Sequence, residues 1–84
     1  MNNERITAIL YLHKRSLKCD VDIPLDITVN DLIIGINEGF QLGMDISDLS
    51  KCYLKTENPI AFLKGNKCIS EYGLRNGTII NITE

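Results

Sequence analysis

The amino-acid sequence predicts a single α+β domain in which a mixed sheet of four to five strands packs on one main helix. Apolar residues alternate at period two near the start of the chain, then recur at helical spacing, and later fall in short runs separated by turn signals. The 84 residues suffice for one domain and are too few for two. A composition of 44% hydrophobic and 24% charged residues excludes disordered and low-complexity classes. We therefore expect one domain over residues 1–84.

The first two strands are predicted over residues 5–13 and 17–25, joined as an antiparallel hairpin by a short polar link. In the first strand one face is apolar: Ile6, Ala8, Leu10 and Leu12. In the second strand the alternation places on one face Leu17, Cys19, Val21, Ile23 and Leu25. Pro24 cannot donate a backbone hydrogen bond, so we expect strand pairing to fray there. The apolar faces of both strands are expected to point toward the core.

A helix of three to four turns is predicted after the hairpin, because the apolar period changes. Residues at i, i+3, i+4, i+7 and i+11 share a narrow sector: Val29, Leu32, Ile33, Ile36 and Phe40. Thr28 is expected to cap the N-terminus, Asp31 suits the positive end of the helix dipole, and Gly43 is expected to end the helix. Gly35 and Gly39 each cost about 1 kcal/mol relative to alanine. We therefore expect packing to hold the helix, with a close approach to the sheet as the reason for the glycines.

Shorter elements are predicted in the second half of the chain. We expect a third strand over residues 52–56, a turn at Asn58-Pro59, and a short strand over residues 60–63. Residues 70–73 are typical of a single capped turn. Asn76-Gly77 is a strong turn signal before a β-branched last strand over residues 78–82.

This order of elements resembles the β-grasp, or ubiquitin-like, fold. The local sequence adds to the resemblance, because one segment is similar to the ubiquitin-like run from a glycine turn into a Leu-Ser-Asp-Tyr type corner: Leu63-Lys64-Gly65-Asn66-Lys67-Cys68-Ile69-Ser70-Glu71-Tyr72-Gly73-Leu74. A second stretch resembles the small bacterial ubiquitin-like proteins of the YukD and EsaB family, which are encoded with type VII secretion systems: Glu71-Tyr72-Gly73-Leu74-Arg75-Asn76-Gly77-Thr78-Ile79-Ile80-Asn81-Ile82.

The resemblance implies an accessory protein on the cytoplasmic side of a secretion machine, acting by protein–protein contact. It also implies a structural role for Tyr72, whose hydroxyl would bond a backbone group of the preceding loop. Ubiquitin and the sulfur carriers use a C-terminal diglycine, whereas this sequence ends Asn81-Ile82-Thr83-Glu84. We therefore expect neither conjugation nor sulfur carriage.

Charge and hydropathy exclude several partner classes. The formal net charge is −2 with the signs interspersed, so the chain lacks the basic field that nucleic acid requires. The longest apolar runs, residues 8–12 and 32–34, are far below the ~20 residues that cross a bilayer. Residues 1–5 lack the pattern of an export signal. We expect a cytoplasmic protein, or one held at the inner face of the cell membrane through a protein partner.

Candidate catalytic and metal-binding groups are sparse, and we expect no enzyme activity, no cofactor and no metal. The single histidine, His13, has no acidic neighbour in sequence to orient it, and Cys19 is expected to point toward the core. Cys52 and Cys68 are expected to pack as small apolar residues, since no CxxC pair suggests zinc or a disulfide framework. The acidic residues of the second strand are spaced too widely for one cation: Asp20, Asp22 and Asp26.

The informative residues are apolar side chains that the periodicity places outside the core. Ile9 and Tyr11 share the outer face of the first strand, and with Tyr53 they form our first candidate for a partner-binding surface. The resemblance supports this choice, since ubiquitin-like domains commonly bind through the exposed sheet face. Ile34 and Leu42, on the helix away from the buried stripe, form the second candidate.

Three functions remain open from the sequence. The first is a non-catalytic ubiquitin-like adaptor that docks on a cytoplasmic domain of a type VII secretion membrane complex. The alternative is a small non-catalytic ubiquitin-like subunit of a soluble multicomponent enzyme such as a monooxygenase. A diglycine-type carrier that has lost or hides its tail ranks last.

Overall fold

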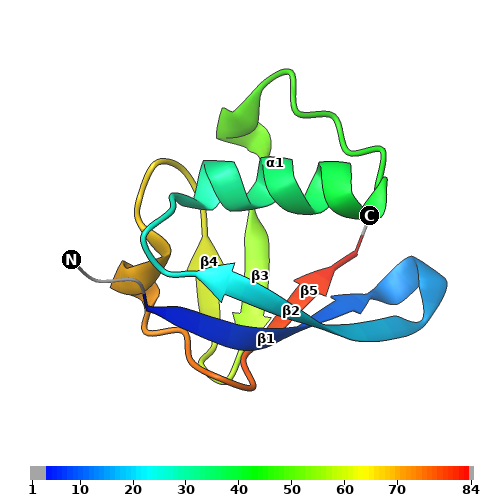
Figure 1. Ribbon diagram of the computed structural model, residues 1–84. Coiled ribbons are helices and arrows are strands. Elements are labelled where there is room, and N and C mark those ends of the chain that lie inside the picture. Colours follow the sequence, from blue (N-terminus) through cyan, green and yellow to red (C-terminus); the bar gives the residue numbers. More distant parts are fainter. Residues whose placement is uncertain (1–3, 84) are drawn as a thin grey trace.

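The predicted fold class is confirmed by the structure, a computed structural model that describes residues 4–83. One helix packs on one face of a five-stranded mixed sheet (Figure 1). Residues 1–3, on which part of the export-signal expectation rests, and Glu84 at the end of the sequence lie outside the described residues. Within residues 4–83 no helix is long and apolar enough to cross a membrane.

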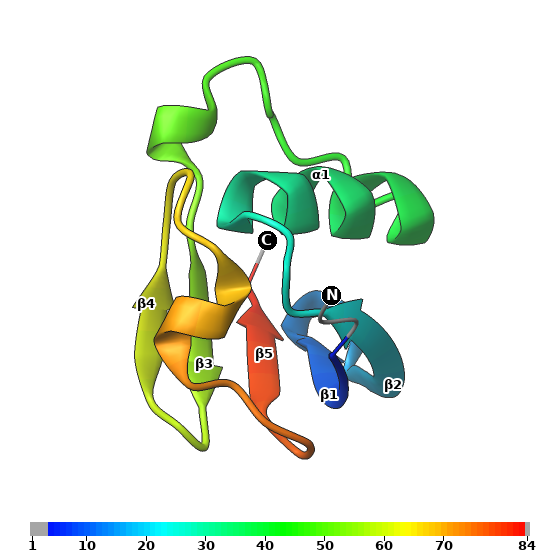
Figure 2. The ribbon, with the colours of Figure 1, turned by 60° about the vertical axis from the view of Figure 1, so that its left-hand side comes forward.

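The sheet has the strand order β2-β1-β5-β3-β4, with β1 and β5 parallel at its centre and the other pairs antiparallel. The strands are β1 (Arg5–Leu12), β2 (Leu17–Pro24), β3 (Leu54–Glu57), β4 (Ala61–Leu63) and β5 (Ile79–Ile82), and the helix is α1 (Val29–Phe40). Three short 3-10 turns complete the fold: η1 (His13–Arg15), η2 (Leu49–Lys51) and η3 (Ile69–Tyr72). Figure 2 shows α1 lying across one face of the sheet, with η2 in the loop beyond the helix.

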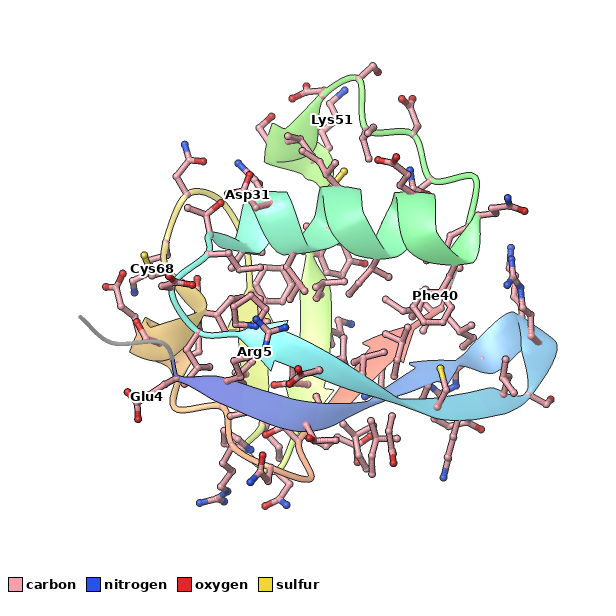
Figure 3. All side chains as sticks on the ribbon, viewed as in Figure 1. Glu4, Arg5, Asp31, Phe40, Lys51 and Cys68 are labelled. Carbon is pink, nitrogen blue, oxygen red and sulfur yellow. The ribbon has the colours of Figure 1, made fainter. Side chains whose placement is uncertain are left out.

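The core lies between α1 and the inner face of the sheet, as the two periodicities predict. The buried side chains of β1 are Ile6, Ala8, Leu10 and Leu12, and those of α1 are Val29, Leu32, Ile33 and Ile36. Figure 3 shows Phe40 below the helix, where it packs against this cluster. Leu17 belongs to the inward-facing set of β2 residues, as predicted. Its side chain is nevertheless 45% exposed, because it lies at the end of this edge strand.

The start of α1 is confirmed, whereas its end is not where the sequence placed it. The Asp31 backbone N–H donates to Thr28 Oγ1 over 3.1 Å, which is the predicted cap. The helix ends at Phe40 and is closed by Gln41, which takes the left-handed conformation with φ 51°. Gly43 also has a positive φ, of 70°, but it lies beyond the end of the helix. The reason is a contact with the segment that follows the helix, since the Asn37 side chain binds both the N–H and the carbonyl of Met44 and draws the chain back early.

The expected reason for the helix glycines is wrong. Gly35 and Gly39 both lie on the exposed side of α1, and a Cβ built at either would meet no atom within 4 Å. Neither glycine therefore serves a close approach to the sheet.

The second half of the chain differs in its strand bounds. The third strand begins at Leu54 rather than at residue 52, because the Cys52 N–H donates to Leu49 O and keeps Cys52 in the η2 turn. The expected role of Tyr72 is confirmed, since its hydroxyl donates to Lys64 O over 3.3 Å.

Candidate functional site

The face of the sheet turned away from α1, here called the outer face, carries every second strand residue. Its side chains alternate with the buried ones, so their placement follows directly from strand pleating. The strand residues of the outer face are Arg5, Thr7, Ile9, Tyr11, Lys18, Asp20, Asp22, Pro24, Lys55, Glu57, Phe62, Ile79 and Asn81.

Strand register aligns five of these residues across the sheet. Lys18 of β2 lies opposite Tyr11 of β1, which pairs with Asn81 of β5. Asn81 lies opposite Lys55 of β3, which pairs with Phe62 of β4. We call this line the central row. Residues from the two ends of the sequence therefore form one continuous surface that no local sequence pattern specifies.

Two residues of the central row, Tyr11 and Phe62, each belong to a stacked aromatic pair. The rings of Tyr11 and His13 stack with centroids 3.8 Å apart, and those of Tyr53 and Phe62 stack with centroids 4.9 Å apart. Tyr53 and Phe62 are 45% and 53% exposed. Stacked rings are rigid and largely apolar, and such residues are enriched at protein interfaces.

Each aromatic pair is accompanied by a lysine. The Lys18 ammonium lies 4.8 Å from the centre of the Tyr11 ring, and the Lys55 ammonium lies 5.8 Å from the centre of the Tyr53 ring. Both distances allow a cation–π attraction, which holds the charge close to the ring. The surface therefore presents aromatic area and positive charge together.

A polar bridge joins the two halves of the outer face. His13 Nε2 and Asn81 Oδ1 are 2.8 Å apart, and Asn81 Nδ2 donates to Glu57 Oε2 over 3.0 Å. The bridge runs from η1 through β5 to β3, so the orientation of the Asn81 amide is fixed in the middle of the central row. The His13 ring, which sequence alone leaves without an orienting partner, is held by both Tyr11 and Asn81.

The structure brings the first-choice residues to one face and leaves the second-choice pair elsewhere. Ile9 is half-buried on the outer face opposite Ile79, in the same strand as Tyr11. Tyr53 lies on that face through its stack with Phe62. Ile34 and Leu42 are both half-buried, on α1 and just after it, and Leu42 packs against the core.

Two exposed apolar residues were missed by the sequence reasoning. Phe62 stacks on Tyr53. Ile60 is 91% exposed and lies in the turn immediately before β4. Of the four large apolar side chains that are exposed among residues 4–83, only Leu17 lies elsewhere. The sequence signal that could have identified Phe62 as exposed is its alternation with the buried Leu63. A strand of three residues is, however, too short to establish a period.

An open pocket of about 300 Å³ lies between the η2 loop and the end of β5. Ser47 donates from both its hydroxyl and its backbone N–H to Asp45, which lowers the pKa of that carboxyl below its usual value. The buried Cys52 thiol donates to two backbone carbonyls, those of Asp45 and Asp48. These groups satisfy one another, and no cluster of three or more metal-ligating side chains occurs in the described part of the chain.

Comparison with known proteins identifies the fold. No protein-family model and no curated protein sequence matches this chain. Solved structures do match, and one of them is described by the words "Molecular Mimicry of SUMO promotes DNA repair". It has a TM-score of 0.71 and 20% identity, and the alignment covers 100% of this chain and 96% of that one. The chain therefore has a ubiquitin-like β-grasp fold.

Proposed function

We propose that this chain is a non-catalytic interaction module that binds a partner protein through its outer face. The observation that carries the proposal is the exposed stack of Tyr53 on Phe62, with Ile60 beside β4 and the second stack of Tyr11 on His13. Clustered exposed apolar side chains on a small domain are typical of a binding surface, whereas scattered ones are ordinary. The solved neighbour's description as a mimic of SUMO supports a role through protein contact.

The finer proposal is that the partner belongs to a bacterial type VII secretion complex. The support is the resemblance of residues 71–82 to the YukD and EsaB family. In this proposal the chain works in the cytoplasm, at the inner face of the membrane, by docking on a cytoplasmic domain of the complex. It acts without conjugation to a target and without a cofactor. The small subunit of a soluble multicomponent enzyme is the other outcome that the experiment below separates.

The proposal is tested by crosslinking the tagged protein in the cells that encode it, then solubilising with detergent and identifying captured proteins by mass spectrometry. We expect enrichment of a secretion ATPase or its membrane partners, with crosslinks on the outer face. The Tyr53→Ser, Phe62→Ser double variant should fold and lose the capture. Leu17→Ser is the matched control, because Leu17 is as exposed as Tyr53 but lies at the end of β2, away from the outer face.

Two results would change the proposal in different ways. Recovery of a soluble oxygenase instead of a secretion component would reassign the function to that complex while leaving the outer face as the binding surface. Equal capture by the double variant and the control would reject the outer face itself.

A further inference from the structure

The charges of the outer face are divided by rows. The central row holds two positive side chains, Lys18 and Lys55, and no carboxylate. The next row along the strands runs from Asp20 to Glu57 through the apolar residues Ile9 and Ile79. The central row is therefore basic and aromatic, and the next row is acidic and aliphatic.

Within residues 4–83, neither of the two lysines of the central row forms an ion pair. Neither ammonium lies within 4.0 Å of a carboxylate among residues 4–83, where the ion pair of the outer face is Arg5 with Asp22 at 2.8 Å. The nearest acid along β3, Glu57, accepts a hydrogen bond from Asn81. Both ammonium groups lie over tyrosine rings, which keeps them near the surface where a partner would contact the rings.

We infer that the partner presents an acidic segment to the central row, with apolar side chains between its carboxylates. This inference rests on the proposed function, because it concerns the same face. Complementary charge steers association and selects among partners, and aromatic residues supply the buried contact area. A basic segment would meet two unpaired lysines and is disfavoured at the same place.

The register sets the spacing that such a segment needs. The Cα positions of Lys18 and Lys55 are separated by three strand spacings, about 14 Å. An extended chain covers about 13 Å in four residues. The partner segment therefore carries Asp or Glu four residues apart, with an apolar residue midway on the same side.

Two other occupants of the face are distinguishable. An anionic membrane would contact the two lysines but would be repelled by the acids of the same face: Asp20, Asp22 and Glu57. A second copy of the chain could place its acidic row against the central row, which would make a dimer. The experiment below detects binding to a membrane and binding to a second copy, and either result would contradict the inference.

The experiment selects binders from a display library of random twelve-residue peptides against the folded protein. We expect the enriched peptides to be acidic and aromatic or aliphatic, with acids four residues apart. Titration of one such peptide into ¹⁵N-labelled protein should shift the amide signals of Tyr11, Asn81 and Lys55. The affinity should fall as salt concentration rises, because exposed charge pairs are screened.

Charge-reversed variants provide the matched test. Lys18→Glu and Lys55→Glu should each weaken peptide binding about fivefold. Lys67→Glu is the control, since Lys67 also lies over a tyrosine ring, that of Tyr72 at 5.4 Å, but outside the outer face. It makes the same change in net charge and should weaken binding less than about twofold.

The inference is overturned if the enriched peptides are neutral or basic, or if Lys67→Glu weakens binding as much as the other two variants. Binding of the protein to vesicles of phosphatidylglycerol that is lost in Lys55→Glu would favour a membrane instead. Dimerisation that is lost in the same variant would favour a second copy. If the Tyr53→Ser, Phe62→Ser variant loses the cellular partner while Lys18→Glu and Lys55→Glu retain it, the proposed function stands and this inference fails.

Discussion

Replacing Gly35 and Gly39 by alanine should stabilise the fold. Both residues lie on the exposed side of α1, and an added Cβ meets no atom within 4 Å at either position. A glycine in a helix interior is about 1 kcal/mol less favourable than alanine. Gly35 lies in the middle of the helix and should give the full effect, whereas Gly39 is next to its last residue and should give about half. The double variant should therefore gain about 1.5 kcal/mol.

For a domain of this size, 1.5 kcal/mol corresponds to a rise of about 6–12 °C in the melting temperature. The assay is thermal and urea unfolding followed by circular dichroism, with the single variants measured beside the double. Gly73→Ala is the control, because Gly73 has φ +71° and alanine is strained there. The control should destabilise by about 1 kcal/mol. A lower melting temperature for Gly35→Ala would refute the reasoning and show that the glycine serves a contact of the helix.

The same double variant also tests which face binds. Alanine at these positions adds two methyl groups to the exposed side of α1, near Ile34, and changes nothing on the outer face. If the partner binds the outer face, its affinity for the double variant should equal that for the wild type. A loss of affinity together with a gain in stability would direct attention to the helix surface.

Three further substitutions test the core, a buried hydrogen bond and an acid-sensitive turn. Leu10→Ala should cost about 2–5 kcal/mol in the free energy of unfolding, since Leu10 is fully buried, and near-wild-type melting would contradict the assigned inward face. Thr78→Val should cost about 1–3 kcal/mol in urea unfolding, because the buried Thr78 hydroxyl donates to Asn58 O over 2.7 Å and valine leaves that carbonyl unpaired. The lowered pKa of Asp45 means that its contribution to stability is present above the usual value of 3.8 and is lost as pH falls through the lower folded value. Asp45→Asn should therefore make unfolding less dependent on pH below 3.8, and an unchanged acid profile would show that Ser47 does not stabilise the charged form.

The parts of the fold that follow from burial were predictable from the sequence. Side chains of a strand return to the same face every two residues, and those of a helix every 3.6 residues. The positions of the apolar residues in the sequence therefore identify the inward faces of β1 and α1. Thr28 was predictable as a cap because the cap hydrogen bond is local, reaching only to Asp31. The sheet and its packing on one helix follow from these elements and from the order in which they occur.

The ends of elements depend on particular hydrogen bonds that the propensity of a single residue does not specify. Gly43 is the stronger helix-stop residue by itself, yet Gln41 ends α1 because the Asn37 amide binds Met44. Similarly, Cys52 alternates with Leu54 as a strand would, but its N–H is already used by Leu49 O in the η2 turn. In both cases a hydrogen bond between residues three to seven positions apart in the sequence overrides the secondary-structure propensity of a single residue.

The candidate surface was predictable only in part, for a related reason. Ile9 and Tyr11 share a strand, so alternation alone places them together. Their juxtaposition with Asn81 and Lys55 depends on register through β5, which joins residues far apart in sequence. Phe62 lies in a strand too short to show a period, and its place on the surface is identified by its register with Lys55 and its stack with Tyr53.

The inner face of the sheet supplies the core, whereas the outer face is exposed to solvent. This difference explains how such a domain can change its partner without changing its fold. The inner face and α1 supply the core, so substitutions there cost several kcal/mol from a stability of only about 5–15 kcal/mol. Outer-face side chains such as Phe62 and Lys55 stand on the same strands but are exposed to solvent, so replacing them costs little. A shared fold at 20% identity is the expected result when inward residues are constrained and outward ones are free to vary. Under the proposed function, partner specificity would therefore be set by exposed residues such as those of the central row, which include Lys18 and Lys55.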